Sequence, residues 1–287
     1  QVGKFVRIQV SYTDGQGTVE TINSSATSAV VNVNDVPTGS VTIAGTATEN
    51  ETLTASNNLA DADGLGTLNY QWQQSTDGTN WTNINGETSN SLTLGDNQVG
   101  KFVRIQVSYT DGQGTVETVN SNATSAVTNV NNSPTGSVTL TGTATENETL
   151  TATNNLADAD GLGTLNYQWQ QSTDGTNWTN ISGATNTTLS LGDNQVGKFV
   201  RIQVSYTDGQ GTIETINSSA TSAVVNVNDV PTGSVTIAGT ATENETLTAS
   251  NNLADADGLG TLNYQWQQST DGTNWTNISG ATNTTLS

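Results

Sequence analysis

Pairs of aspartates recur at a fixed phase of this sequence, and they are the side chains with which it could do chemistry. Asp61 and Asp63 stand two residues apart before a glycine, and the same Asp-Ala-Asp-Gly sequence returns at 158–161 and 255–258. Carboxylates are preferred ligands of hard cations such as Ca²⁺, which take six to eight oxygens. The 287 residues include no Cys and no His, which excludes thiolate and imidazole chemistry. The carboxylates are therefore the candidate functional groups.

Catalysis by these acids is not expected. Hydrolysis by two carboxylates needs them at a defined separation across a groove, and other catalysis needs a nucleophile beside a base. Nothing in the sequence places two acids across a groove within one repeat. We therefore expect that the protein is not an enzyme.

The charge balance narrows the range of partners. The chain carries 26 acidic and six basic residues, a formal net charge of −20. Phosphate binding requires clustered cations, so nucleic acid is excluded as a partner, and anionic membrane surfaces are disfavoured. No apolar run has the length of a transmembrane helix, so we expect no membrane insertion.

A repeat of 97 residues organises the sequence. The segment Gln1–Ile8 returns at 98–105 and again at 195–202, and residues 1–93 and 195–287 differ at only seven positions. A repeat of this length is a whole domain and not a solenoid unit. Such near-identity predicts one function performed many times, which suits length, stiffness or avidity better than catalysis.

The phase of the repeat predicts the domain boundaries. Pro37 and Pro134 occupy the same position in successive repeats, so we place each boundary just before the proline. Four domains or parts of domains are expected: 1–36 as the C-terminal half of a repeat, 37–133 and 134–230 as complete repeats, and 231–287 as the N-terminal part of a repeat.

The two partial repeats are complementary in sequence. Residues 1–36 and 231–287 together lack only the counterparts of Leu191-Gly192-Asp193-Asn194. Other copies of the chain could therefore complete them head to tail by strand donation. The alternative is that the sequence is a window cut from a longer array.

The hydrophobic pattern predicts strands and no helix. Apolar residues alternate with polar ones in short runs that are rich in β-branched and aromatic residues, and Asp-Gly turns separate several of these runs. Expected strands are 40–45, 51–55, 68–74, 81–84, 91–94, 101–110 and 115–130. Seven short strands in 97 residues predict an immunoglobulin-like β-sandwich, with Trp72 as the core tryptophan. The fold class is all-β, with such sandwiches in a linear array.

This topology predicts where the acids meet. Asp61 and Asp63 lie in the loop after the second strand, Asp111 lies in the final hairpin turn, and Asp35 lies in the preceding linker. We expect them to converge at a domain junction, with Ca²⁺ as the cofactor. The candidate metal ligands of the whole chain are Asp35, Asp61, Asp63, Asp111, Asp158, Asp160, Asp208, Asp229, Asp255 and Asp257.

A second interpretation of these acids stays open. Asp-x-Asp-Gly is also a common turn sequence that is solvated and needs no ligand. In addition, the second linker carries Asn132 in place of Asp35, so a site that relies on this carboxylate is predicted to be weaker there.

Other polar and aromatic residues have simpler interpretations. Glu49, Glu51 and Asp96 are expected at the opposite end of the domain, where a solvated turn and an edge-strand charge are favoured over a contribution to the next junction. Trp81 is expected to close a hairpin over the sandwich, with stacking on sugars as the alternative. Lys101 and Arg104, the only bases of the repeat 37–133, are expected to pair with acids on neighbouring strands.

An ordered set of motifs resembles a known family. Leu59-Ala60-Asp61-Ala62-Asp63-Gly64, Tyr70-Gln71-Trp72-Gln73 and Ser108-Tyr109-Thr110-Asp111-Gly112 follow one another, and the linker reads Asn34-Asp35-Val36-Pro37. The set resembles the tandem immunoglobulin-like or cadherin-like repeats of giant bacterial surface adhesins, many of which carry repeats-in-toxin tails. The resemblance covers essentially the whole chain.

The resemblance implies a role and a location. It implies an extracellular extender at the bacterial cell surface that holds an adhesive tip away from the cell and is often rigidified by calcium. The partners would then be neighbouring repeats of the same array. The alternative from another class is an array of modules that bind glycans or proteins directly.

Overall fold

Alternating apolar and polar residues form antiparallel strands along the chain, so the all-β prediction is confirmed. The computed structural model describes residues 1–287, which divide into two compact units, Gln1–Asn132 and Ser133–Ser287. Each unit holds one full sequence repeat and one partial repeat. No helix in the structure has the length and hydrophobicity needed to cross a membrane.

The first unit contains nine strands and one short 3₁₀ turn. They are β1 (Gln9–Thr13), β2 (Val19–Asn23), β3 (Val41–Ala44), β4 (Thr52–Asn57), β5 (Asn69–Ser75), β6 (Thr82–Asn83), β7 (Ser91–Thr93), η1 (Asp96–Gln98), β8 (Phe102–Thr110) and β9 (Val116–Asn120).

The second unit contains twelve strands and the equivalent 3₁₀ turn. They are β10 (Val138–Thr141), β11 (Thr149–Asn154), β12 (Asn166–Ser172), β13 (Thr179–Asn180), β14 (Thr188–Ser190), η2 (Asp193–Gln195), β15 (Phe199–Thr207), β16 (Ile213–Asn217), β17 (Val235–Ala238), β18 (Leu247–Asn251), β19 (Gln267–Gln268), β20 (Thr276–Asn277) and β21 (Thr285–Leu286).

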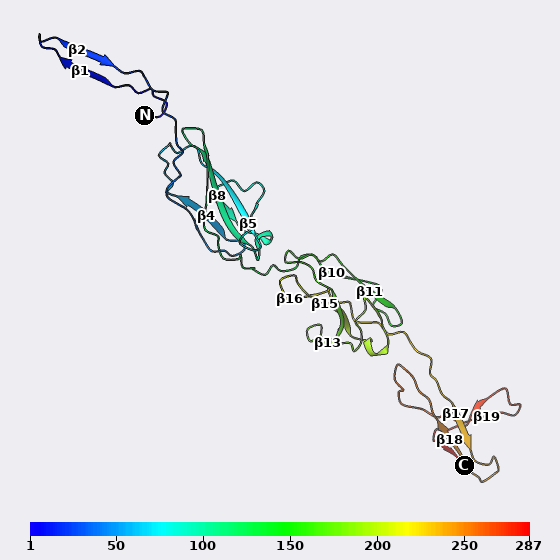
Figure 1. The fold of residues 1–287 in the computed structure, drawn as a ribbon. Coiled ribbons are helices and arrows are strands. Elements are labelled where there is room, and N and C mark those ends of the chain that lie inside the picture. Colours follow the sequence, from blue (N-terminus) through cyan, green and yellow to red (C-terminus); the bar gives the residue numbers. More distant parts are fainter. The chain divides into compact units, whose positions relative to one another are not determined.

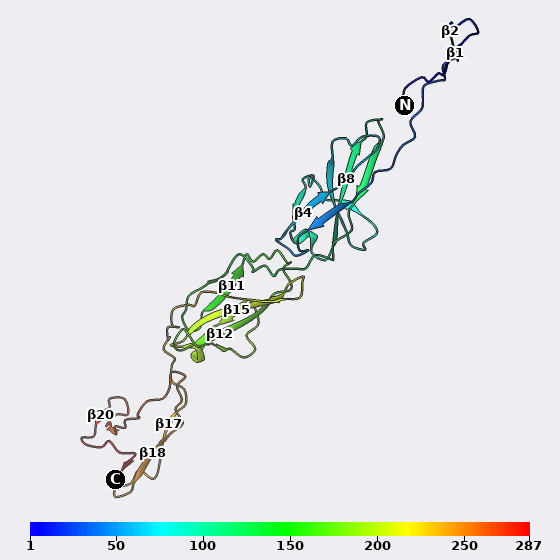
Figure 2. The same cartoon turned by 90° about the vertical axis from the view of Figure 1, so that its left-hand side faces the viewer.

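Two sheets form the sandwich of each full repeat. In the first unit the strand orders are β3-β4-β7 and β6-β5-β8-β9, and Figure 1 labels β4 of the first sheet and β5 and β8 of the second. In the second unit the orders are β10-β11-β14 and β13-β12-β15-β16, with β11, β12 and β15 visible in Figure 2. This two-sheet arrangement is the predicted immunoglobulin-like sandwich.

The core lies where the inner faces of the two sheets meet. Trp72 on β5 is fully buried, and its indole N–H donates to the carbonyl oxygen of Ser89 at 2.9 Å. On β8, every second residue is buried, from Val103 to Tyr109. Both features match the sequence prediction, because a strand with one face on the core alternates with period two.

The last predicted strand is shorter than expected. Instead of running from 115 to 130, β9 ends at Asn120. The hydroxyls of Ser121 and Thr124 accept the backbone N–H groups of Ile105 and Val103, both at 3.1 Å. Because side-chain oxygens replace carbonyls here, the regular ladder is interrupted and the chain moves toward the other sheet, where Thr128 forms a parallel bridge to Thr48.

The partial repeats contain only parts of a sandwich. In the hairpin β1–β2, dark blue in Figure 1, every residue of both strands is exposed. Residues 231–287 form a three-stranded sheet of order β17-β18-β21 and the short pair β19-β20. The three-stranded sheet matches β3-β4-β7, whereas no strand stands in the place of β8 or β9.

Candidate metal centres at the ends of the repeats

Glycine at position 112 joins the two loops that carry the acids. The backbone N–H of Gly112, in the β8–β9 turn, donates to the carbonyl oxygens of Asp63 at 3.1 Å and Gly64 at 3.2 Å. A Cβ at position 112 would lie 2.6 Å from the Asp63 oxygen, which is a steric clash. Because glycine has no Cβ at this position, the loop after β4 can pack directly against the β8–β9 turn.

Asp111 is the central carboxylate of this end. Its Oδ1 accepts backbone N–H groups of Gln113 at 2.9 Å and Thr115 at 2.8 Å. Its Oδ2 is buried and has no hydrogen-bond partner, and only 6% of the residue is exposed. Burial opposes ionisation, but the backbone donors of the turn outweigh it and hold the pKa of Asp111 below its ordinary value. An ionised, buried oxygen without a donor is the environment that a cation stabilises.

Two further carboxylates surround Asp111. One carboxylate oxygen from each of Asp61, Asp111 and Glu117 lies within 4.8 Å of the other two. The hydroxyl of Tyr109 donates to Oδ2 of Asp61 at 2.6 Å, and burial together with this carboxylate raises the pKa of Tyr109. Tyr109 therefore stays protonated and orients Asp61. The donor set is all oxygen and anionic, which fits Ca²⁺.

The second repeat builds the same centre. Asp158, Asp208 and Glu214 bring their carboxylate oxygens within 4.8 Å of one another, and Tyr206 donates to Asp158. Oδ2 of Asp208 is again buried without a partner, and 6% of the residue is exposed. Asp160 is buried beside this centre and donates its N–H to Oδ1 of Asp158 at 2.9 Å.

The first linker is hydrogen-bonded to this end of the repeat. Oδ2 of Asp63 accepts the backbone N–H of Asp35 at 2.8 Å and the side-chain amide of Asn32 at 3.3 Å. The amide of Asn34 donates to Oε1 of Glu117 at 2.6 Å. Asp35 thus meets Asp63 through its backbone, while the residue itself is exposed.

The remaining sequence candidates belong to the third copy of the motif. The backbone N–H of Asp229 donates to Oδ2 of Asp257 at 2.8 Å, and that of Asp257 donates to Oδ1 of Asp255 at 3.0 Å. The hydrogen bond from the linker to the loop, which joins Asp35 to Asp63 in the first copy, therefore recurs in the third copy.

Sequence reasoning missed Glu117 and its counterpart Glu214. Glu117 pairs with Tyr109 across the β8–β9 hairpin. Counting outward from the turn Asp111–Gly114 gives this register, since turn length fixes strand pairing. The signal was therefore present in the sequence.

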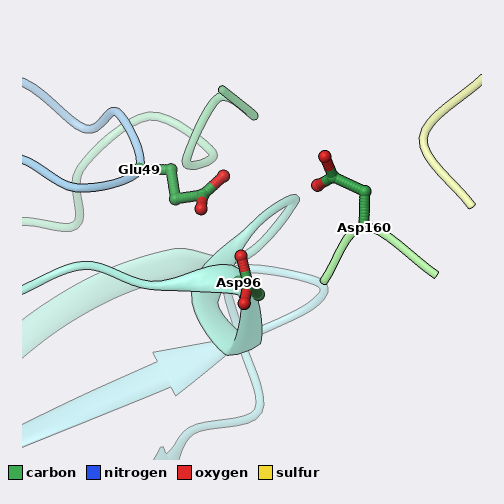
Figure 3. Close-up of side chains that lie close together, drawn as sticks. All are labelled: Glu49, Asp96 and Asp160. Atoms are coloured by element: carbon green, nitrogen blue, oxygen red, sulfur yellow. The ribbon is translucent and has the colours of Figure 1, made fainter. Parts of the chain in front are cut away.

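A second acidic group lies at the opposite end of the first repeat. Glu49 is 3% exposed, so its interpretation as a solvated turn residue is wrong. The Asn132 amide donates to Oε1 of Glu49 at 3.0 Å and to Oδ1 of Asp96 at 3.2 Å, and Val130 N–H donates to Oε2 of Glu49 at 3.1 Å. Figure 3 shows the carboxylates of Glu49 and Asp96 at this end. Burial opposes the ionisation of Glu49, but its hydrogen bonds with Val130, Asp96 and Asn132 hold its pKa below the ordinary value.

The corresponding group of the second repeat contains a third acid. Glu146, Asp193 and Asp229 have carboxylate oxygens within 4.8 Å of one another. A hydrogen bond with Asp193 raises the pKa of Glu146, and burial followed by the nearby charge of Asp193 raises that of Asp229. Asp229 stands where the first repeat has Asn132. An amide that donates hydrogen bonds to both carboxylates of the first repeat is therefore replaced in the second repeat by a third carboxylate, which adds to the repulsion between Glu146 and Asp193.

This difference predicts the effect of exchanging the two residues. In chelator at neutral pH, Asp229→Asn should raise the thermal midpoint of the second unit, because an amide can donate to both Glu146 and Asp193. The matched exchange, Asn132→Asp, should lower the midpoint of the first unit. Differential scanning calorimetry of both variants checks this, and a shift of the same sign in both would contradict it.

Trp81 and Arg104 form a separate contact on the face of the four-stranded sheet. The Arg104 guanidinium lies 4.4 Å from the centre of the Trp81 ring, and its Nε donates to Gln73 at 2.8 Å. The prediction that Arg104 pairs with an acid is therefore wrong. One face of the indole is covered by Arg104, which does not favour the sugar-stacking alternative.

Two of the solved structures with similar chains come from adhesion proteins. One is a crystal structure of a tetra-tandem repeat in the extending region of a large adhesion protein, at 17% identity and a TM-score of 0.28, covering 87% of this chain and 64% of that one. Another is a Ca²⁺-stabilized adhesin that helps an Antarctic bacterium reach out and bind ice, at 14% identity and a TM-score of 0.28, covering 85% and 65%. This chain thus spans just under two thirds of either structure. No curated protein matches it.

A family model matches the sequence three times. Its description is Domain of unknown function (DUF8696), and it matches residues 37–132, 131–229 and 233–287. The three matches follow the sequence repeat and together cover most of the chain. The chain therefore belongs to the DUF8696 family.

Proposed function

We propose that this chain is a structural extender segment of an extracellular bacterial adhesin or surface filament, rigidified by Ca²⁺ at the ends of its repeats. The observation that carries the proposal is the duplicated carboxylate centre. Asp111 and Asp208 each present a buried, unpartnered oxygen at the same end of two near-identical sandwiches. The sequence resemblance to adhesin repeats supplies the class of protein and the bacterial cell surface as its location.

Length is the property that repetition supplies directly. β8 and β15 each contain nine residues, and a strand rises about 3.3 Å per residue, so each repeat contributes about 30 Å of strand. We take 37–133 and 134–230 as complete sandwich domains, 1–36 as a C-terminal half and 231–287 as an N-terminal part.

Stiffness would arise at the linkers. The first linker already donates hydrogen bonds to Asp63 and Glu117, which limits its freedom. A Ca²⁺ ion held by Asp61, Asp111 and Glu117 would neutralise the charge that these residues share and fix the loops that meet the linker. The partners in this proposal are neighbouring repeats of the array and other copies of the chain, joined head to tail.

Small-angle X-ray scattering of the 287-residue chain tests this function. In millimolar Ca²⁺ the maximum dimension should be larger than in chelator, and the distance distribution should keep the form of a rod, because the linkers lose freedom. Mg²⁺ at equal concentration is the ionic-strength control and should have a smaller effect, since it dehydrates reluctantly and demands octahedral geometry. Identical curves in Ca²⁺ and chelator would contradict the rigidification, and a compact particle in both would contradict the extender role.

A further inference from the structure

We infer that each full repeat contains a mechanical latch, formed in the first repeat by a parallel contact between the segments 46–50 and 127–132, and that Glu49 is its positioning residue. The inference rests on the proposed function, because an extender that holds an adhesive tip carries tension when the tip is bound. It names the contact through which a repeat resists that tension. In the second repeat the latch lies between the segments 143–147 and 224–229.

Backbone hydrogen bonds join the two segments of the first latch side by side. The N–H of Glu49 donates to the carbonyl oxygen of Thr128 at 2.9 Å, and the N–H of Thr128 donates to that of Ala47 at 3.0 Å. Thr48 and Thr128 form a parallel bridge, and the hydroxyl of Thr128 donates to that of Thr48 at 3.0 Å. The contact therefore links the start of the repeat directly to its end.

The position of the two segments in the sequence decides which bonds tension meets. Only β3 separates segment 46–50 from the linker that enters the repeat, and segment 127–132 runs into the linker that leaves it. The strands β4 to β9 lie between the two segments in sequence. Tension that crosses the latch therefore bypasses the backbone of these strands, and the core is shielded while the latch holds.

The parallel direction of the two segments makes the latch resistant. Tension pulls segment 46–50 toward its N-terminus and segment 127–132 toward its C-terminus. These are opposite directions along one axis, because the segments run parallel. The backbone hydrogen bonds run between the segments, across this axis, so they carry the tension together and must break together. In an antiparallel hairpin pulled at its open end, the bonds would instead break one at a time.

Glu49 holds the exit segment with its side chain as well as its backbone. The residue is 3% exposed. Its Oε2 accepts the N–H of Val130 at 3.1 Å, and its Oε1 accepts the side-chain amide of Asn132 at 3.0 Å. Hydrogen bonds to an ionised acceptor are stronger than those between neutral groups, and a buried site strengthens them further. Glu49 thus makes three bonds to the segment that leaves the repeat.

The backbone of the latch recurs in the second repeat. The N–H of Glu146 donates to the carbonyl oxygen of Val225 at 2.9 Å, and the N–H of Val225 donates to that of Ala144 at 2.9 Å. Oε2 of Glu146 accepts the N–H of Val227 at 3.0 Å, and 2% of Glu146 is exposed. Because both full repeats build it, the latch is a property of the repeat.

The two latches differ in their side chains. Val225 replaces Thr128 and brings no hydroxyl, and Asp229 replaces Asn132. The second latch therefore lacks the hydroxyl bond of the first and has two further carboxylates near Glu146, that of Asp229 among them. We expect the second repeat to unfold first under tension in chelator.

Unfolding of the 287-residue chain at constant force in an optical trap tests the inference, in chelator so that the ion centres do not contribute. Each full repeat should lengthen the chain in one step of about 300 Å, because its residues are released together once the latch opens. Forced unfolding is governed by the unfolding rate. Glu49→Gln should increase this rate for the first repeat by about tenfold or more, because it removes the charge that strengthens two hydrogen bonds.

A second latch variant acts on the backbone alone. Thr128→Pro removes the N–H that is donated to Ala47, and should accelerate the first repeat by about tenfold as well. A variant whose step keeps the wild-type length is folded. Should one of the two variants lose its step, the other decides the outcome. The step of the second repeat should stay unchanged in both and is the internal reference.

Two controls separate resistance to tension from general stability. Glu51→Gln makes the same change two residues away on an exposed side chain, and should unfold as the wild type. Trp72→Ala removes a core ring from the strands that tension bypasses. It should lower the thermal midpoint strongly but accelerate forced unfolding by less than about threefold, because contacts that are intact when the latch opens have little effect on that rate.

Two outcomes would overturn the inference. One is equal acceleration by Glu49→Gln and Glu51→Gln, and the other is a larger acceleration by Trp72→Ala than by Thr128→Pro. Either result would show that tension does not cross the contact between the two segments.

The extender function is decided separately, by the scattering experiment in Ca²⁺. None of the latch variants changes Asp61, Asp111 or Glu117, so their response to Ca²⁺ should remain. A rod-like chain whose latch variants unfold as the wild type would refute the latch alone. A compact chain whose latch variants unfold faster would refute the extender function alone.

Discussion

Replacing Trp72 with alanine should lower the free energy of unfolding of the first full repeat by about 3–5 kcal/mol. Trp72 is fully buried and packs in the core cluster with residues of both sheets, among them Leu53 and Ile105. The substitution leaves a cavity and also deprives the carbonyl oxygen of Ser89 of its indole donor. Because the core of a single repeat is thin, a loss of this size is a large fraction of its total stability.

Denaturant unfolding monitored by tryptophan fluorescence measures this loss, and differential scanning calorimetry measures the corresponding fall in the thermal midpoint. The second full repeat, with its own buried Trp169, should unfold at the wild-type midpoint and serves as an internal reference. Trp81→Ala is the matched control, at the residue just before β6 of the same sheet. It removes only a half-buried ring stacked on Arg104, so its cost should be about 1 kcal/mol. Equal effects of the two substitutions would show that the core is not built around Trp72.

Ca²⁺ should raise the thermal midpoints of both full repeats relative to chelator, by about 10 °C when its concentration is well above the dissociation constant. Binding to the folded state alone stabilises it by mass action, and the buried oxygens of Asp111 and Asp208 exist only in the folded state. The substitution Asp111→Asn should abolish most of this response in the first repeat and leave that of the second. Asparagine keeps an acceptor for the N–H groups of Gln113 and Thr115 but removes the charge.

The control for this prediction is Asp77→Asn, in a different turn. Asp77 accepts the backbone N–H groups of Thr79 at 2.8 Å and Asn80 at 2.7 Å, and these hydrogen bonds, that of Asn80 first, hold its pKa far below the ordinary value. The variant should lower the midpoint equally with and without Ca²⁺. Differential scanning calorimetry measures the thermal midpoints of the wild type, Asp111→Asn and Asp77→Asn, and isothermal titration calorimetry measures their Ca²⁺ binding. A wild-type thermal midpoint that does not change with Ca²⁺ would contradict the proposal that these carboxylates bind Ca²⁺.

Local pattern was sufficient to predict most strands. The alternation on β8 predicted its buried face, and the Tyr-x-Trp pair predicted the core tryptophan, because the period of a strand with one buried face is written in its residue types. The end of β9 could not be predicted in this way. The apolar pattern continues to 130, whereas the ladder ends where the Ser121 and Thr124 hydroxyls replace carbonyls as acceptors.

The candidate metal centre was predicted in outline only. Asp61 and Asp111 meet as expected from the topology, and Asp63 turns to the linker. Glu117 was missed, although the hairpin register contains it. The burial of Glu49 was also missed, because its partner Asn132 lies 83 residues away and no local pattern reports so distant a contact.

The sequence by itself determined the repeat, the all-β class, the strand faces and the excess of carboxylates, since each follows from residue types at short range or from the identity of repeats. Only the tertiary structure decided which carboxylates are buried together and which oxygens lack a donor. The physical reason is that one sequence changes its surroundings with context. Val10 is 55% exposed and Val107 is fully buried, although they occupy the same position of the repeat, because burial depends on which strands fold against them.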